Sequence, residues 1–121
     1  MRTLCCLFLL FAAPAYADES ADFAAIRNTL ATFNHASERA TVLARHADLP
    51  RLDRFAGEGV SQIYFAVTFI RFVTPDVAFA DATASQFGSV ILKRSSPAMF
   101  VLKREAGAWR ISVLRIPGWD R

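Results

Sequence analysis

The fold is decided by the stretch MFVLKREAGAWRISVLRI, residues 99–116. Its two halves, 99–104 and 109–116, are rich in residues that favour strands, and the segment EAGA between them (105–108) contains a glycine. Two such runs joined by a short segment with glycine indicate a β-hairpin. Apolar and polar residues alternate only partly along both runs. We therefore expect one face of the hairpin to be buried and the other to be half covered.

The residues before the hairpin extend the sheet. Residues 68–73 are rich in β-formers, and Thr74-Pro75-Asp76 is typical of a turn, because proline fixes φ and aspartate can bond the backbone. The return strand, 77–87, places Val77, Phe79 and Phe87 on one face and four small residues on the other: Ala78, Ala80, Ala82 and Ala84. The alanine face can lie close under a helix.

Less regular segments flank this pair of strands. The aromatic and β-branched residues of 60–66 favour a strand that begins between Val60 and Ile63, although a short helix also fits their spacing. On the other side, 89–93 is expected to continue the sheet. Ser95-Ser96-Pro97 is then expected to turn the chain into the hairpin.

The N-terminal half predicts helices. Four large apolar residues recur at steps of three and four, as on one side of an amphipathic helix: Phe23, Ile26, Leu30 and Phe33. Ser37 is expected to cap a second, shorter helix that runs to about Arg45, and 47–55 is expected to be irregular. Helices followed by a meander of about four strands predict an α+β domain, a cone in which N-terminal helices pack on a curved antiparallel sheet.

Residues 1–17 have the pattern of a signal peptide. A short basic start, an apolar run from Leu4 to Ala13, and Ala15-Tyr16-Ala17 predict cleavage before Asp18. The run is too short to span a bilayer as a helix. Cys5 and Cys6 both lie in this leader, so we expect an exported protein without disulfides, periplasmic or secreted, formed by one domain over residues 18–121. We expect no membrane contact after cleavage.

Composition and spacing argue against several function classes. The net charge is +3, and the basic residues are scattered singly or in pairs, so we expect no nucleic-acid binding. His35 and His46 are eleven residues apart, without the clustered spacing of metal ligands, so we expect no metal. The sequence contains neither a Gly-x-Ser-x-Gly elbow nor a glycine-rich phosphate loop, and we expect no cofactor.

Three segments together resemble the nuclear transport factor 2-like superfamily, in its SnoaL-like branch of small secreted bacterial proteins. They are AAIRNTLATFNHA (24–36), IRFVTPDVAFADATASQFGS (70–89) and FVLKREAGAWRISVLRI (100–116). The resemblance implies a cone that commonly holds a pocket, and a dimer formed through the outer face of the sheet. It implies no particular activity, because the superfamily includes isomerases, dehydratases, epoxide hydrolases and members without known catalysis.

Tyr64, Arg71 and Asp81 are the candidate ligand-binding residues, provided that strand parity turns them into the cone. A buried carboxyl beside a tyrosine could move a proton on a hydrophobic substrate. Alternatively, Arg71 pairs with Asp81 across the hairpin, and Tyr64 is a core aromatic with its hydroxyl at the rim.

Three functions stay open at this point. The first is binding of a small apolar ligand in the cone. The second is an isomerase or hydratase-like lyase acting on a small hydrophobic substrate. The third is a non-catalytic dimeric interaction module whose cone is filled by its own side chains. The 11 phenylalanines favour a filled cone or an apolar ligand over a polar one. Apolar side chains on both parities of the hairpin also predict a homodimer through the outer face of the sheet.

Overall fold

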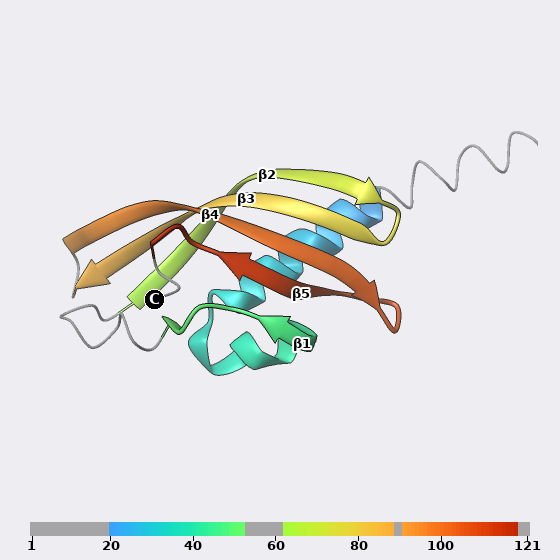
Figure 1. Cartoon of the computed structure of the whole chain (residues 1–121), viewed down its shortest axis with the longest axis horizontal. Helices are drawn as coiled ribbons and strands as arrows, with labels where there is room; N and C mark the ends of the chain where they lie inside the picture. The colour runs from blue at the N-terminus through green and yellow to red at the C-terminus, as the bar shows by residue number, and fades with distance from the viewer. Residues whose placement is uncertain (1–19, 53–61, 89–90, 119–121) are drawn as a thin grey trace, which may run out of the picture.

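A computed structural model of the chain describes residues 20–52, 62–88 and 91–118 (Figure 1). An N-terminal helix covers residues 20–33. It is followed by the 3-10 helix η1 (Ala36–Val42) and by five strands: β1 (Leu43–Asp48), β2 (Gln62–Thr74), β3 (Val77–Gly88), β4 (Ile91–Glu105) and β5 (Ala108–Arg115). The expected signal peptide lies outside the described residues.

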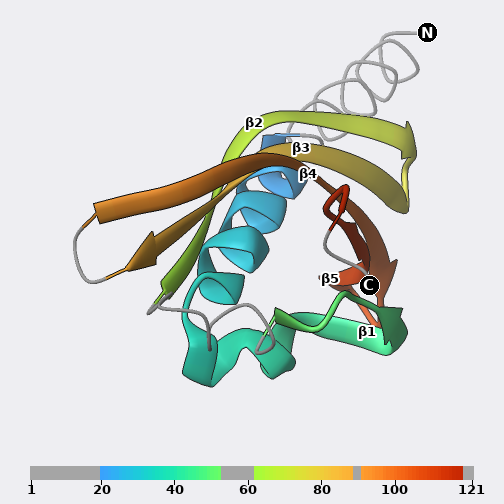
Figure 2. The same cartoon turned by 60° about the vertical axis from the view of Figure 1, so that its left-hand side comes forward.

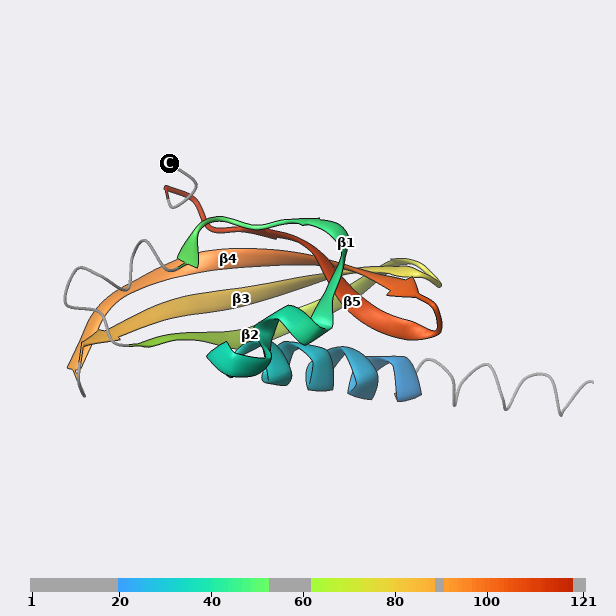
Figure 3. The same ribbon diagram turned by 90° about the horizontal axis from the view of Figure 1, so that it is seen from below.

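The five strands form one sheet in the order β1-β5-β4-β3-β2. Strands β2 to β5 are antiparallel neighbours, and β1 joins the edge of β5 in the parallel direction. The sheet curves around the N-terminal helix, which lies along its concave face (Figure 2, Figure 3). The expected α+β cone is therefore confirmed, with one strand more than the sequence predicts.

The alanine face of β3 lies under the helix, as its parity predicts. Ala78, Ala80 and Ala84 are completely buried, and so are Ile26 and Phe33 on the helix. Small side chains on the sheet let these large helix side chains reach the backbone of the strands, where each buried apolar side chain contributes about 1.5–3 kcal/mol of transfer free energy.

Three aromatic rings fill the space between the helix and the sheet. The ring centroids of Phe33, Phe65 and Phe100 lie 5.3–5.6 Å apart, and all three side chains are fully buried. Tilted and edge-on contacts of this kind are favourable beyond the area that they bury. The inside of the cone at this level is therefore packed with the protein's own side chains.

A cluster around Arg104 holds the other end of the helix. Its guanidinium donates to Asp22 Oδ2 at 2.7 Å and to Asp76 Oδ1 at 3.1 Å, and it lies over the ring of Trp109. The indole of Trp109 donates to Asp22 Oδ1 at 3.2 Å. The hydrogen bond from Arg104, more than that from Trp109, holds the pKa of Asp22 below its ordinary value against partial desolvation. The cluster ties the helix to the β2–β3 turn, β4 and β5.

The second helix is shorter than the sequence predicts. The 3-10 helix ends at Val42, and the cap residue is His35, whose side chain makes no capping bond. Leu43–Asp48 then forms β1 instead of helix and irregular chain, so this part of the prediction is wrong. The sequence LARHAD has little strand propensity of its own, and only the free edge of β5 makes it a strand. The register slips between Leu43 and Asp48, where His46 has a φ of 59°.

The turn expected at Ser95-Ser96-Pro97 is also wrong, because β4 runs unbroken through it. Pro97 pairs with Thr83 of β3. Along the described residues, the pairing of β4 with β5 begins only at Met99, so at Pro97 β4 has β3 as its one neighbour. Proline has no N–H to donate, and a sheet tolerates it at such an edge position.

A β-bulge in β5 changes which side chains face outward. Leu102 pairs with Ile111 and Val101 with Val113, so Ser112 is the extra residue. The bulge turns Ile111 and Leu114 to the same side, and both are fully buried. The sequence predicts apolar side chains on both parities of the hairpin. In this second run, however, Ile111, Leu114 and Ile116 are all buried, and of the four apolar residues from 111 to 116 only Val113 is left on the outer face.

The β4–β5 hairpin is confirmed, and it contains one strained residue. Glu105 pairs with Ala108, and the two-residue loop between them has φ of 54° at Ala106 and 81° at Gly107. Positive φ at both loop residues is the pattern of a type I′ turn, which favours Asn-Gly. An alanine there carries the steric cost of the left-handed region.

Replacing Ala106 with Asn should stabilise the protein. The side chain at 106 is exposed, so the change affects mainly the backbone preference, and we expect the free energy of unfolding to rise by about 1 kcal/mol. Urea unfolding measures the difference. Ala108→Asn is the control, because Ala108 is also exposed but has a negative φ. An equal gain in both variants would refute the assignment of strain to Ala106.

Candidate functional site

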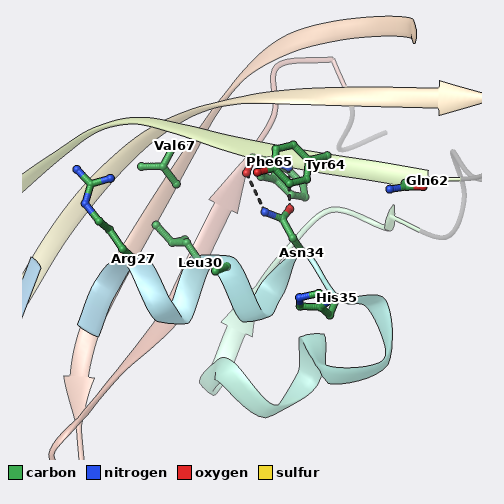
Figure 4. A pocket seen from close by; sticks show the side chains of 9 residues that line it. Arg27, Leu30, Asn34, His35, Gln62, Tyr64, Phe65 and Val67 are labelled. Atoms are coloured by element: carbon green, nitrogen blue, oxygen red, sulfur yellow. Dashed lines mark hydrogen bonds between the residues drawn. The ribbon is translucent and has the colours of Figure 1, made fainter. Parts of the chain in front are cut away.

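A groove of about 490 Å³ lies between the C-terminal half of the N-terminal helix and the edge strand β2 (Figure 4). The helix, together with Asn34 and His35 that follow it, forms one wall, and β2 forms the other. The lining consists of Arg27, Leu30, Ala31, Asn34, His35, Gln62, Tyr64, Phe65 and Val67. The groove follows the margin of the cone and does not enter the packed centre.

The side chain of Asn34 crosses the groove and joins the helix to β2 through two hydrogen bonds. The amide Nδ2 donates to the carbonyl oxygen of Phe65 at 2.9 Å, and the amide Oδ1 accepts from the N–H of Phe65 at 2.7 Å (Figure 4). The carboxamide thus occupies the place of a peptide group in a neighbouring strand. Because it satisfies an otherwise unpaired position of β2, it also blunts the edge of the sheet.

Arg39 supports the same end of the helix. Its Nε donates to the carbonyl oxygen of Phe33 at 2.7 Å, and its guanidinium lies over the Phe33 ring, 4.9 Å from the centroid. A cation at this position satisfies one of the last helical carbonyls. Burial lowers the pKa of Arg39. The end of the helix that carries Asn34 and His35 is therefore held by the chain that follows it.

Apolar and polar groups are separated along the groove. Leu30 and Phe65 are fully buried and form its floor. Arg27, His35, Gln62 and Tyr64 are exposed, and within the described part of the chain none of their side chains has a hydrogen-bond or ion-pair partner. The described residues of the lining carry one formal charge, that of Arg27, and no carboxylate. Such a site can hold an apolar body while its polar rim bonds a headgroup.

The structure does not bring the three sequence candidates together. Tyr64 lines the groove and is 47% exposed. Arg71 and Asp81 lie on the outer face, on the parity opposite to the buried alanines of β3. Arg71 lies over the ring of Phe79, and among the described residues no ion pair joins it to Asp81. Tyr64 pairs with Ser85, which has the same parity as Asp81. The condition for placing the three side chains in the cone, an inward parity, is therefore not met.

Sequence reasoning missed the helix side of the groove. Arg27, Ala31 and Asn34 follow one another at helical spacing, which could have marked them as one face of the helix. The sequence analysis considered only the apolar face. His35 was considered as a metal ligand, and both it and His46 are exposed. The described residues contain no group of three potential metal ligands, and no helix among them is long and apolar enough to cross a membrane.

Comparisons with known proteins support the fold. No protein-family model and no curated protein matches the sequence. Among solved structures, one from Catenulispora acidiphila, in complex with S-DNPA, has a TM-score of 0.61 at 16% identity and covers 80% of this chain and 92% of its own.

A second similar structure is a domain of unknown function with a cystatin-like fold from Nostoc punctiforme PCC 73102. It has a TM-score of 0.58 at 21% identity, and the match covers 81% of this chain and 75% of that one. At these identities the likeness establishes the fold alone. The protein has a cystatin-like fold.

Replacing Asn34 with Ala should separate the helix from β2. The variant loses two hydrogen bonds and leaves both backbone groups of Phe65 without a protein partner, so we expect a loss of about 1–3 kcal/mol in the free energy of unfolding. Chemical denaturation measures it. Asn28→Ala is the matched control, because Asn28 is exposed on the same helix and its side chain makes no hydrogen bond within the described chain. Equal stability of the two variants would show that the hydrogen bonds between Asn34 and Phe65 contribute nothing to the free energy of unfolding.

Proposed function

We propose that this protein is a nuclear transport factor 2-like domain of the SnoaL-like branch that binds a small amphipathic molecule in the groove beside β2. The observation that carries the proposal is the groove itself, with a buried apolar floor and a rim of polar groups that have no partner. The sequence predicts a ligand pocket inside the cone. We place the ligand instead in the groove at the edge of the cone, because Phe33, Phe65 and Phe100 fill the centre.

Size and chemistry both support ligand binding. The groove volume falls within the range of small-molecule sites, roughly 300–1,000 Å³. Its floor offers Leu30 and Phe65, and its rim offers donors and acceptors of four different kinds. The fold neighbour from Catenulispora acidiphila is in complex with a small ligand, S-DNPA, which is consistent with small-molecule binding on this architecture.

Binding is favoured over an isomerase or hydratase-like lyase. Either reaction would require an acid or base held near the substrate, with a pKa adjusted by burial. No carboxylate belongs to the described residues of the groove lining, and its phenol and imidazole, from Tyr64 and His35, are both exposed. Asp81, the carboxylate that the sequence suggested, lies on the outer face.

The outer face supports the further proposal of a homodimer. Phe69 is 58% exposed, Val73 53% and Met99 37%. Beside them, the half-buried side chains of Phe79, Val101 and Val113 form one row across β3, β4 and β5. A two-fold copy would cover such a patch with an identical surface. The alternative, a monomer whose outer face is shielded by the stems of cations such as Arg71 and Lys103, predicts a different mass. A non-catalytic dimeric interaction module would use the same face.

Filling the groove should abolish ligand binding without damage to the core. Ala31 is exposed and lines the groove, so Ala31→Trp places a large ring where a ligand would lie. With 1-octanol as the probe, we expect shifts of the amide resonances of Leu30 and Val67 in the natural protein and none in the variant. Ala24→Trp, on an exposed position outside the lining, should leave the shifts intact. A natural protein that shows no shift at millimolar 1-octanol would refute the proposed function.

Export and dimerisation can be tested in one measurement. We propose a periplasmic or secreted protein, cleaved after Ala17 as its leader pattern suggests. Native mass spectrometry of the protein from a periplasmic extract of its host should give twice the mass of a chain that starts at Asp18. A chain that retains Cys5 and Cys6 would refute export, and a monomer that persists at rising micromolar concentration would refute the dimer.

A further inference from the structure

The charge of the groove narrows the class of ligand. We propose that the groove selects a linear monocarboxylate, with its carboxylate on Arg27 and its apolar chain over Leu30 and Val67. This inference rests on the proposed function, because it names the chemistry of the molecule that the same groove would hold. It goes further in assigning one residue to the headgroup and one sign of charge to the ligand.

Arg27 combines a guanidinium without a partner among the described residues with a place in the groove lining. Arg104 and Arg115 hold carboxylates, and Arg39 donates to a backbone carbonyl. Arg45 and Arg71 also lack a hydrogen-bond or ion-pair partner for their side chains in the described chain, but neither lines the groove. Arg27 has no hydrogen-bond or ion-pair partner in the described part of the chain, although it extends from the helix toward β2 beside Val67 (Figure 4). Its donors are therefore free for a ligand, and a guanidinium matches a carboxylate with two parallel hydrogen bonds.

The surroundings of Arg27 favour a monoanion over other headgroups. Among the described residues, no acidic side chain lines the groove, so none of them competes with a ligand anion or attracts a cation. The described lining also offers no second cation beside Arg27, and a dianion such as a phosphate monoester would leave part of its charge unmatched. One guanidinium and one negative charge are balanced.

The geometry sets the length of the ligand. Arg27 and His35 lie eight residues apart, which corresponds to about 12 Å along a helix. Leu30 and Val67 follow Arg27 along the groove, and the hydrogen-bonded pair Asn34–Phe65 comes next (Figure 4). A carboxylate at Arg27 would therefore be followed by apolar surface. The amide of Asn34 and the polar groups of Gln62 and His35 mark the far end of the groove. An unbranched chain of about eight carbons has the required shape.

The test compares ligands that share one chain and differ in the headgroup. We expect octanoate to bind the natural protein about tenfold more tightly than 1-octanol at the same ionic strength, since a charge-assisted hydrogen bond is stronger than one between neutral groups. Octylammonium should bind more weakly than 1-octanol. In Arg27→Gln the affinity for octanoate should fall to that for 1-octanol, whereas the affinity for 1-octanol should stay unchanged. Amide shifts in a titration measure all three affinities.

Arg45→Gln is the matched control. It removes the same charge from an exposed side chain on β1, at the opposite edge of the sheet, and should keep the preference for octanoate. Equal binding of octanoate and 1-octanol by the natural protein would overturn the carboxylate assignment and leave the proposed function standing. A preference that survives in Arg27→Gln would overturn the role of Arg27. Binding of none of the three probes would overturn both proposals.

Discussion

The close packing of the N-terminal helix on the alanine face of β3 is the constraint on which the rest of the structure depends. Ala78, Ala80 and Ala84 let Ile26 and Phe33 come within contact of the sheet, and the curvature of the sheet follows the helix that it covers. A larger side chain at any of these three positions would have to displace the helix or strain the strands, because protein interiors have no spare volume at this density.

Polar contacts at both ends of the helix determine its position along the sheet. Asp22 holds the N-terminal end through Arg104 and Trp109, and Asn34 holds the C-terminal end through the backbone of Phe65. Non-directional apolar packing would allow the helix to slide or rotate, whereas hydrogen bonds of defined geometry do not. The groove lies beside the second of these contacts, which joins the end of the helix to β2.

The arrangement separates stability from function. The centre of the cone is occupied by three aromatic rings and is unavailable to a ligand, and the margin carries the polar groups that make no bond within the described chain. A site at a margin can change its rim residues with little effect on the core, since exposed substitutions seldom alter stability by much. This separation is consistent with an architecture that hosts many unrelated activities.

The sequence by itself determined the features that depend on near neighbours. The helix over Phe23 to Phe33, the turn at Pro75-Asp76, the alanine parity of β3 and the 105–108 hairpin all follow from periodicity and turn chemistry within a few residues. Tertiary structure decided the rest. β1 is a strand because β5 offers an edge, Pro97 is tolerated because β4 has β3 as its one described neighbour there, and the bulge at Ser112 reverses the parity of β5. The groove also belongs to this group, because Arg27 and Asn34 meet Tyr64 and Val67 only when the helix lies on the sheet. No local sequence pattern determines how the helix is placed against β2.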